Sequence, residues 1–218
     1  MSSRASVRNV AAVPEQAARE PVQWGVAMRC RRGEATSGDL AVVTLLPEGV
    51  LVAGIDGLGH GAEAARAARK AAAVLRESPS QDLVLLVERC HAALKGTRGA
   101  AISLAFVSPS KSGMTWLGVG NVEGRLLSGD PSATRLKGSL PLGNGVPGHE
   151  LPAVRVANLD LLTGDVLVLA TDGVGATFAD SLDISGSPRA ISERILAEHS
   201  KPLDDALVVA VRYLGVRP

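Results

Sequence analysis

The sequence predicts an α+β fold in which helices pack outside sheets of antiparallel strands. Runs rich in Val and Leu and bounded by Gly, Pro, Asp or Ser recur along the chain, and most follow one another directly. The segments with helical periodicity are grouped and do not alternate with the strands, which differs from a βαβ repeat. Aromatic residues make up only 2% of the chain, so we expect a core of many small aliphatic side chains, as in stacked sheets.

The expected strands fall into an early and a late group. The early strands are 22–28, 40–46, 50–55, 100–107, 114–119 and 124–127, and the late strands are 153–159, 166–170 and 206–214. The spacing of apolar residues predicts helices over 62–76, 82–95 and 189–198. Pro188 precedes the last helix, a position typical of a first turn. The glycine-rich segment 143–148 is expected to form a loop or flap.

Length and composition favour one domain and exclude several classes of protein. A chain of 218 residues suits a single domain, which we place at residues 21–218 after an N-terminal extension of residues 1–20. The 23 Lys and Arg residues balance 22 Asp and Glu residues, so no positive field indicates nucleic-acid binding. No apolar run approaches the ~18 residues of a membrane span, and no signal peptide is evident. We therefore expect a cytoplasmic monomer that binds neither nucleic acid nor membrane, with Cys30 and Cys90 as reduced thiols in the core.

Two aspartates are expected to meet at the open end of a hairpin. The turn at 47–49 joins two predicted strands, and Asp39 lies nine residues before Glu48 while Asp56 lies eight residues after it. Directly opposed side chains on neighbouring strands have Cβ atoms roughly 4.5–5.5 Å apart. Two like charges at that separation repel each other unless a cation lies between them.

The same pattern occurs a second time. The sequence LVLATDGVG (167–175) repeats LVAGIDGLG (51–59): an apolar strand, Asp, Gly, any residue and Gly. Asp204 and Asp205 then precede a strand, as Asp39 does. Because a strand start lies beside a strand end in an antiparallel sheet, these carboxylates can gather at one edge. Such oxygen-rich clusters suit Mg²⁺ or Mn²⁺, and glycines after the aspartate let a backbone carbonyl approach the ion as well.

These motifs resemble those of the PP2C-type metal-dependent protein phosphatases. SGD (37–39), DGLGHG (56–61), ATDGV (170–174) and DDALVV (204–209) stand in that family's order. The chain looks closest to the bacterial SpoIIE-like sporulation and stress-response branch, and within it to the short RsbX-like phosphatases of the stressosome. The resemblance covers nearly everything after about residue 20. It implies a PP2C-like αββα sandwich of two antiparallel sheets flanked by helices, with two Mn²⁺ or Mg²⁺ ions in a cleft at one end.

The resemblance also implies roles for individual residues. Asp56 would bridge the two ions, and Asp56 and Asp172 would serve catalysis through a metal-bound water. Asp39 would contact the second ion, directly or through water. Of the adjacent pair, Asp204 is preferred over Asp205 as a ligand, because family members often have Asn at the second position. The full set of candidate metal ligands is Asp39, Asp56, Gly57, Asp172, Asp204 and Asp205.

The sequence departs from the family pattern near these motifs. Leu58 stands where eukaryotic relatives have a His proposed as general acid, and Leu207 stands in a region where the family often has Thr or Ser. His60 follows two residues after Leu58, either as a partner of the site or as a solvated residue at a helix start. Arg31 and Arg32 lie near the position of a phosphate-binding Arg in some relatives.

The implied function is dephosphorylation of phosphoserine or phosphothreonine in a partner protein. The resemblance implies STAS-domain proteins of a stressosome or of an anti-sigma partner-switching circuit as substrates, so that the enzyme resets a stress signal. One alternative is a nucleotide-binding domain that uses GLGHG (57–61) as its phosphate loop. Its glycine spacing misses G-x-G-x-x-G, no Walker lysine follows, and Asp56 would repel a pyrophosphate. A second alternative is an inactive scaffold of the same fold, which would normally lack one or more ligands.

Overall fold

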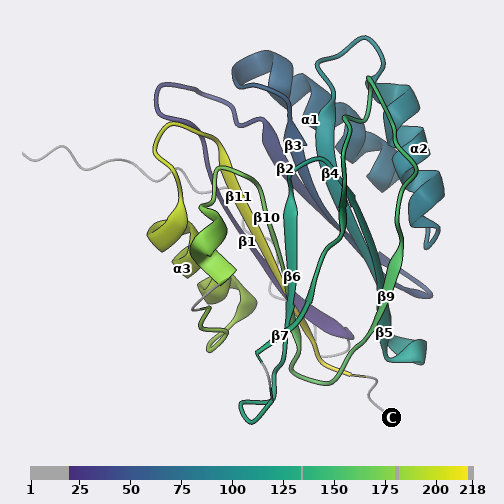
Figure 1. Cartoon of the computed structure of the whole chain (residues 1–218), viewed down its shortest axis with the longest axis vertical. Helices are drawn as coiled ribbons and strands as arrows, with labels where there is room; N and C mark the ends of the chain where they lie inside the picture. Colours follow the sequence, from purple (N-terminus) through teal and green to yellow (C-terminus); the bar gives the residue numbers. More distant parts are fainter. Residues whose placement is uncertain (1–19, 134, 180–181, 216–218) are drawn as a thin grey trace, which may run out of the picture.

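Two β-sheets lie face to face, with helices on both outer sides (Figure 1). The computed structural model describes residues 20–133, 135–179 and 182–215, so almost all of the expected N-terminal extension lies outside the described residues. Helices α1 and α2 cover one sheet and α3 covers the other. This arrangement confirms the predicted α+β sandwich.

The first sheet contains the C-terminal strand near its centre. Its members are β1 (Val22–Arg29), β6 (Glu123–Leu127), β7 (Leu136–Ser139), β10 (Val166–Ala170) and β11 (Ala206–Tyr213), in the order β1-β11-β10-β6-β7. All of these neighbours are antiparallel. Ala170 at the end of β10 pairs with Val208 near the start of β11. The residues after β10 and before β11 therefore share one edge of the sheet.

The second sheet contains the predicted hairpin. Its members are β2 (Asp39–Leu46), β3 (Gly49–Gly57), β4 (Ala100–Ser108), β5 (Gly113–Val119) and β8 (Leu142–Gly143), in that order, with β9 (Ala157–Asp160) also paired to β5. The short β5–β8 pair is parallel and the other pairs are antiparallel. Asp39 pairs directly with Asp56 across β2 and β3, which confirms the register expected from the turn.

The three helices lie where the periodicity predicts them. They are α1 (Gly61–Glu77), α2 (Leu83–Leu94) and α3 (Pro188–His199), and two short 3-10 turns, η1 (Pro109–Lys111) and η2 (Ala176–Ala179), complete the helical segments. The side chains of Asp82 and Ser187 cap α2 and α3 by accepting hydrogen bonds from the third residue along. No helix in the described ranges combines the length and apolarity that a membrane crossing requires.

Three apolar layers separate the four layers of secondary structure. Along β3, Leu51, Ala53 and Ile55 pack toward α1 and α2, whereas Val50 and Val52 pack toward the facing sheet. The third apolar layer joins β10 and β11 to α3. Because the central strands are buried on both faces, they read as continuous apolar runs. The alanine-rich face of α1 allows the helix to lie close to the sheet.

Three strands at the margin of the sandwich differ from expectation. β7 and β8 escaped prediction because they are short and rich in Gly and polar residues, without apolar alternation. The late strand expected over 153–159 begins only at Ala157. The partner strand β5 accounts for the later start. β9 pairs with residues 113–116 of β5, and β8 already pairs with Gly118 and Val119 farther along the same edge.

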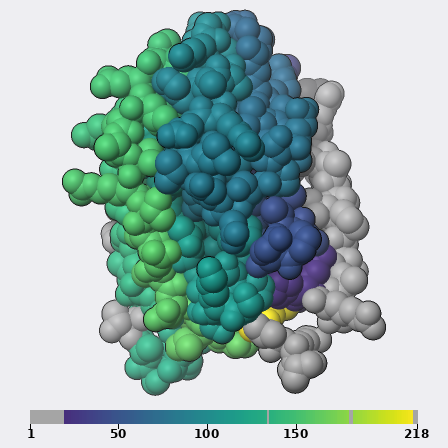
Figure 2. All heavy atoms as spheres, turned by 90° about the vertical axis from the view of Figure 1, so that its right-hand side faces the viewer, coloured from purple at the N-terminus to yellow at the C-terminus, as the bar shows by residue number. Residues whose placement is uncertain are grey.

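The segment expected to form a loop or flap over 143–148 begins at Gly143, the last residue of β8, and continues as a loop that is hydrogen-bonded to its neighbours. Pro147 accepts a hydrogen bond from the Ala100 N–H at 3.2 Å, and the Gly148 N–H donates to His91 Nδ1 at 3.1 Å. Figure 2 shows this part of the chain, in green, along one margin of the face covered by α1 and α2. The loop therefore borders the connection between α2 and β4.

Candidate metal centre

The register of β2 and β3 places two carboxylates together at one end of the sandwich. Asp39 begins β2 and is only 2% exposed, and Asp56 lies directly across from it, next to the end of β3. The Thr171 hydroxyl donates a hydrogen bond to Asp39 Oδ2 at 2.7 Å. The hairpin therefore delivers one buried and one partly buried acidic side chain to the sheet edge.

The second pair of strands delivers its carboxylates to the same edge. Asp172 follows β10, and Asp204 precedes β11, the antiparallel neighbour of β10. Asp172 and Asp204 both act to raise the pKa of Asp56. The aspartates that the repeated pattern singled out therefore lie at one edge of the sandwich, near enough for their charges to act on one another.

Burial and mutual repulsion disfavour the charged forms of this cluster. Burial raises the pKa of Asp39 to about 7; the charges of Asp205, Asp172 and Asp204 act in the same direction, and the Thr171 hydrogen bond opposes them. Burial also raises the pKa of Asp56 to about 9, with further contributions from Asp39, Asp172 and Asp204. None of the ion pairs in the described ranges involves these aspartates. Lys201 Nζ donates to the backbone carbonyl of Asp172 at 2.6 Å, so this ammonium contacts the residue without forming an ion pair with its carboxylate.

The donor atoms at this edge match the chemistry of a hard divalent cation. Carboxylate and carbonyl oxygens are the ligands preferred by Mg²⁺ and Mn²⁺. Across the described ranges, no three acidic, histidine or cysteine side chains stand close enough together to hold an ion as they are. The raised pKa of Asp56, to which Asp172 contributes, favours the protonated form of that carboxyl. A bound ion would have to displace this proton.

The glycines of the β3–α1 turn permit a close approach of the backbone. A Cβ atom on Gly57 would lie 2.2 Å from the Ala64 carbonyl oxygen of α1, so only glycine fits there. The Gly57 N–H donates to the Gly38 carbonyl at 3.0 Å. Gly59 and Gly61 have φ values of +89° and +72°, in the left-handed region that favours glycine.

Asp204 and Asp205 differ in how their oxygens are engaged. Asp205 is 4% exposed, and its two oxygens accept hydrogen bonds from the backbone N–H groups of Arg31 and Gly38 at 2.7 and 2.8 Å. Asp204 is partly exposed, and from the described part of the chain its carboxylate accepts one hydrogen bond, from the Asp205 N–H to Oδ1 at 3.0 Å. Asp204 is thus the member of the pair with more free lone pairs.

Two residues that the sequence interpretation left without a role support the cluster. Thr171 is 2% exposed, donates to Asp39 and accepts the Leu207 N–H at 2.9 Å, so it links β10, β11 and β2. Asn121, which follows β5, donates from Nδ2 to Asp172 Oδ2 at 2.7 Å. The only sequence signals are that Thr171 precedes Asp172 and that Asn121 lies in the VGN segment after a strand.

The histidine, cysteine and serine residues noted in the sequence have ordinary structural contacts. His60 Nδ1 is 2.9 Å from Glu34 Oε1, on the connection between β1 and β2. Cys90 is fully buried, as expected, whereas Cys30 lies just after β1 and is only partly buried, which corrects its assignment to the core. Both thiols are free. Ser37 accepts the Asp39 N–H at 3.0 Å, as in an ordinary turn.

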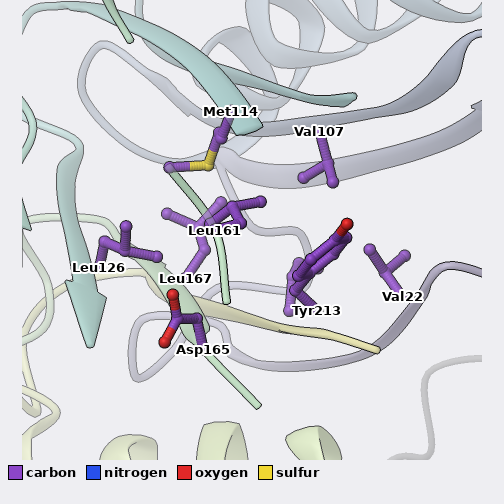
Figure 3. Close-up of a pocket in the computed structure, with 9 residues that line it drawn as sticks. Val22, Val107, Met114, Leu126, Leu161, Asp165, Leu167 and Tyr213 are labelled. Carbon is purple, nitrogen blue, oxygen red and sulfur yellow. The ribbon is translucent and has the colours of Figure 1, made fainter. Parts of the chain in front are cut away.

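A small apolar pocket lies at the opposite end of the sandwich and contains none of the candidate ligands (Figure 3). Asp165 lies at its margin, with its carboxylate satisfied: Lys137 Nζ and the Leu162 N–H donate to Oδ2, and the Gly129 N–H donates to Oδ1. The remaining lining residues are Val22, Val107, Met114, Leu126, Leu161, Leu167, Val211 and Tyr213. This pocket is part of the packed core between the sheets.

Comparisons of the sequence with known proteins find relatives among bacterial phosphatases. The sequence model of the family described as Stage II sporulation protein E (SpoIIE) matches residues 47–214. The phosphoserine phosphatase RsbX of Bacillus subtilis (strain 168) is 28% identical over 155 residues, which cover 71% of this chain and 76% of that protein.

Comparisons of the structure give the same result. A chain from work on the bacterial stressosome, a modular system adapted to control secondary messenger signalling, superposes with a TM-score of 0.81 and 29% identity over 88% of this chain and 100% of that chain. The crystal structure of RsbX in complex with magnesium gives a TM-score of 0.78 at 23% identity over 91% and 98% of the two chains. The PP2C phosphatase domain of SpoIIE from Bacillus subtilis, solved with a fragment of its regulatory domain, gives 0.69 at 20% identity over 90% and 64%. The last two likenesses establish the fold.

Proposed function

The chain belongs to the SpoIIE family of PP2C-type phosphatases, and from this premise we propose that it is a Mn²⁺- or Mg²⁺-dependent protein serine/threonine phosphatase. The observation that carries the proposal is the cluster of aspartates at one end of the sandwich, which runs from the buried Asp39 through the partly buried Asp56 and Asp204 to the exposed Asp172. Burial and neighbouring carboxylates raise the pKa values of Asp39 and Asp56 to about 7 and about 9. Divalent cations would stabilise such a cluster, because no Lys or Arg side chain in the described ranges forms an ion pair with these carboxylates, and Lys201 Nζ donates instead to the Asp172 backbone carbonyl.

Two ions would be held by residues from both sheets. Asp56 would contact both ions from the end of β3, and Asp39 would contact the second from the start of β2. Asp172 and Asp204 would complete the first site together with the Gly57 carbonyl. Asp205 is the weaker candidate, because both of its oxygens already accept backbone hydrogen bonds.

The chain's own residues would orient these ligands. When bound, the ions supply a lowered pKa for the attacking water and positive charge against the phosphoryl oxygens. Thr171 fixes the Asp39 carboxylate by donating to Oδ2, and Asn121 fixes Asp172 in the same way. Residues that orient a metal ligand commonly change metal affinity or activity ~10- to 100-fold when they are removed.

The substrate class that we propose is the phosphorylated STAS-domain protein of a stressosome or of a partner-switching circuit. Two likenesses support it: RsbX is a phosphoserine phosphatase, and the structural neighbour from the bacterial stressosome aligns along its whole length with this chain. By removing phosphate from such a protein, the enzyme would reset a stress signal.

Phosphatase activity with added metal tests the proposal. The purified chain should hydrolyse p-nitrophenyl phosphate when Mn²⁺ or Mg²⁺ is present and should lose that activity in excess EDTA. Hydrolysis of equal rate in EDTA would contradict metal dependence. A phosphoserine-bearing STAS domain and an unrelated phosphoprotein, compared at equal concentration, test the substrate class, and equal rates on both would contradict it.

The alternative of a nucleotide-binding loop finds no support at the start of α1. The Glu34 carboxylate already lies there, with Oε2 3.1 Å from the position of a Cβ on Gly61. Asp56 adds a second carboxylate at this turn, while the Arg98 guanidinium lies beside Gly59, with Nη1 2.6 Å from the position of a Cβ there. The two carboxylates disfavour a pyrophosphate at the start of α1.

A further inference from the structure

Asp205 ties together both ends of the connection between β1 and β2. Its Oδ1 accepts the Arg31 N–H at 2.7 Å and its Oδ2 accepts the Gly38 N–H at 2.8 Å. Arg31 lies two residues after the end of β1, and Gly38 immediately precedes β2. One buried carboxylate at the start of β11 therefore closes this loop from a distant part of the chain.

The contact continues from Gly38 to the candidate metal centre. The Gly38 carbonyl accepts the Gly57 N–H at 3.0 Å, so hydrogen bonds on the two sides of Gly38 link Asp205 to the peptide unit between Asp56 and Gly57. A Cβ on Gly38 would lie 2.9 Å from Ala64 Cβ of α1, so this position has no room for a side chain. The backbone directly after Asp56 is thereby held by the β1–β2 connection.

We propose that Asp205 is a positioning residue: it clamps the β1–β2 connection and, through Gly38, orients the peptide unit that follows Asp56 and the start of β2 at Asp39. The part of this inference that concerns metal binding rests on the proposed function. The clamp itself is a property of the chain without metal. It leaves Asp204 as the metal ligand of the pair and gives the second aspartate a separate task.

Amide hydrogen exchange in EDTA tests the clamp independently of activity. The Asp205→Ala variant should exchange ~10- to 100-fold faster than wild type in peptides covering residues 29–39 and 55–60, because hydrogen bonds to a charged carboxylate are lost at Arg31 and Gly38. The Asp205→Asn variant keeps one acceptor oxygen, so its exchange should be intermediate. If the alanine variant does not fold, the asparagine variant alone should still show faster exchange in these two peptides.

A matched control is the Asp165→Asn variant. Asp165 is also buried and also accepts two backbone N–H groups, from Leu162 and Gly129, at the opposite end of the sandwich. Its replacement should accelerate exchange near residues 129 and 162 and leave residues 29–39 and 55–60 unchanged. Wild-type exchange in 29–39 and 55–60 for both Asp205 variants would overturn the proposal.

Mn²⁺ titration separates a clamp from a ligand. The Asp205→Ala variant should bind Mn²⁺ ~10- to 100-fold more weakly, and Asp205→Asn should recover part of that loss. Weaker Mn²⁺ binding with unchanged exchange would instead make Asp205 a direct ligand and overturn the clamp. Faster exchange in a chain whose wild type shows no phosphatase activity would support the clamp while contradicting the proposed function.

Discussion

Buried aspartates at the two ends of the sandwich meet opposite electrostatic conditions. At the end with the apolar pocket, Asp165 receives Lys137 and two backbone N–H groups. At the other end, Asp39 and Asp56 face further carboxylates, and their pKa values rise to about 7 and about 9. The carboxylate of Asp165 thus has its charge and hydrogen bonds satisfied by the protein, whereas those of Asp39 and Asp56 do not. A buried charge that the chain does not balance indicates a ligand that does.

Removing the charge of Asp56 should have the largest effect on activity. Asp56→Asn takes away the carboxylate expected to touch both ions, so turnover at saturating Mn²⁺ should fall at least ~10³-fold, equivalent to ~4 kcal/mol of transition-state stabilisation. Steady-state kinetics on p-nitrophenyl phosphate measure this. The control, Asp165→Asn, should retain turnover within a few-fold of wild type. An active Asp56→Asn enzyme would refute the bridging role.

In stability, the order of these two variants should be reversed: Asp165→Asn should be the more damaging change. Asp165→Asn removes a charge paired with Lys137, so it should lower the free energy of unfolding by about 2–3 kcal/mol. Asp56→Asn relieves repulsion and should unfold at the same or a higher temperature than wild type in EDTA. Thermal unfolding of the three proteins in EDTA measures both effects. A clear loss of stability in metal-free Asp56→Asn would contradict the picture of an unbalanced cluster.

The metal-free protein should lose stability as pH rises through the titration range of the cluster. The folded-state pKa values of Asp39 and Asp56 lie above the unfolded value of about 3.9, so between these limits the folded state binds more protons than the unfolded state. This contribution is therefore present at about pH 4 and declines as pH approaches about 9. Unfolding in EDTA from pH 5.5 to 8.5 should show a steeper decline for wild type than for Asp56→Asn. Parallel profiles would contradict the assignment.

Removing the partner of Asp39 should give a smaller effect. Thr171→Val keeps the shape of the side chain but removes the hydroxyl that donates to Asp39 and accepts from Leu207. Mn²⁺ affinity should fall ~10-fold, with turnover at saturating metal less affected. Activity measured across a Mn²⁺ titration separates the two quantities. Unchanged metal affinity would show that Asp39 does not need this hydrogen bond.

Much of the fold could be predicted from the sequence because its signals are local. The short turn at Pro47 sets the register of the two strands that it joins, and this register pairs Asp39 with Asp56. The central strands are buried on both faces, so they stand out as apolar runs. β7 and β8 could not be found in this way, since each is held by pairing to a neighbour and not by its own composition.

In the candidate site, too, the residues marked by local sequence could be predicted and those held by long-range contacts could not. The repeated Asp-Gly pattern after apolar runs marks Asp56 and Asp172, because the end of a strand can be recognised from the local sequence. The hydrogen bonds that support the cluster join residues far apart in the chain, such as Gly38 and Asp205 or Thr171 and Asp39. Their partners are set by the meeting of the two sheets, so no spacing in the sequence indicates them.

Calorimetric titration of the metal-free protein with Mn²⁺ tests the central claim most directly. Metal binding requires deprotonated carboxylates, so at pH 7.5 it should release about one proton or more per chain, chiefly from Asp56, whose pKa is raised to about 9. Titrations in two buffers of different ionisation enthalpy give the number of protons released. We predict tight binding with proton release in wild type, and weaker binding with less release in Asp56→Asn. Binding without proton release, or equal release from both proteins, would contradict the account.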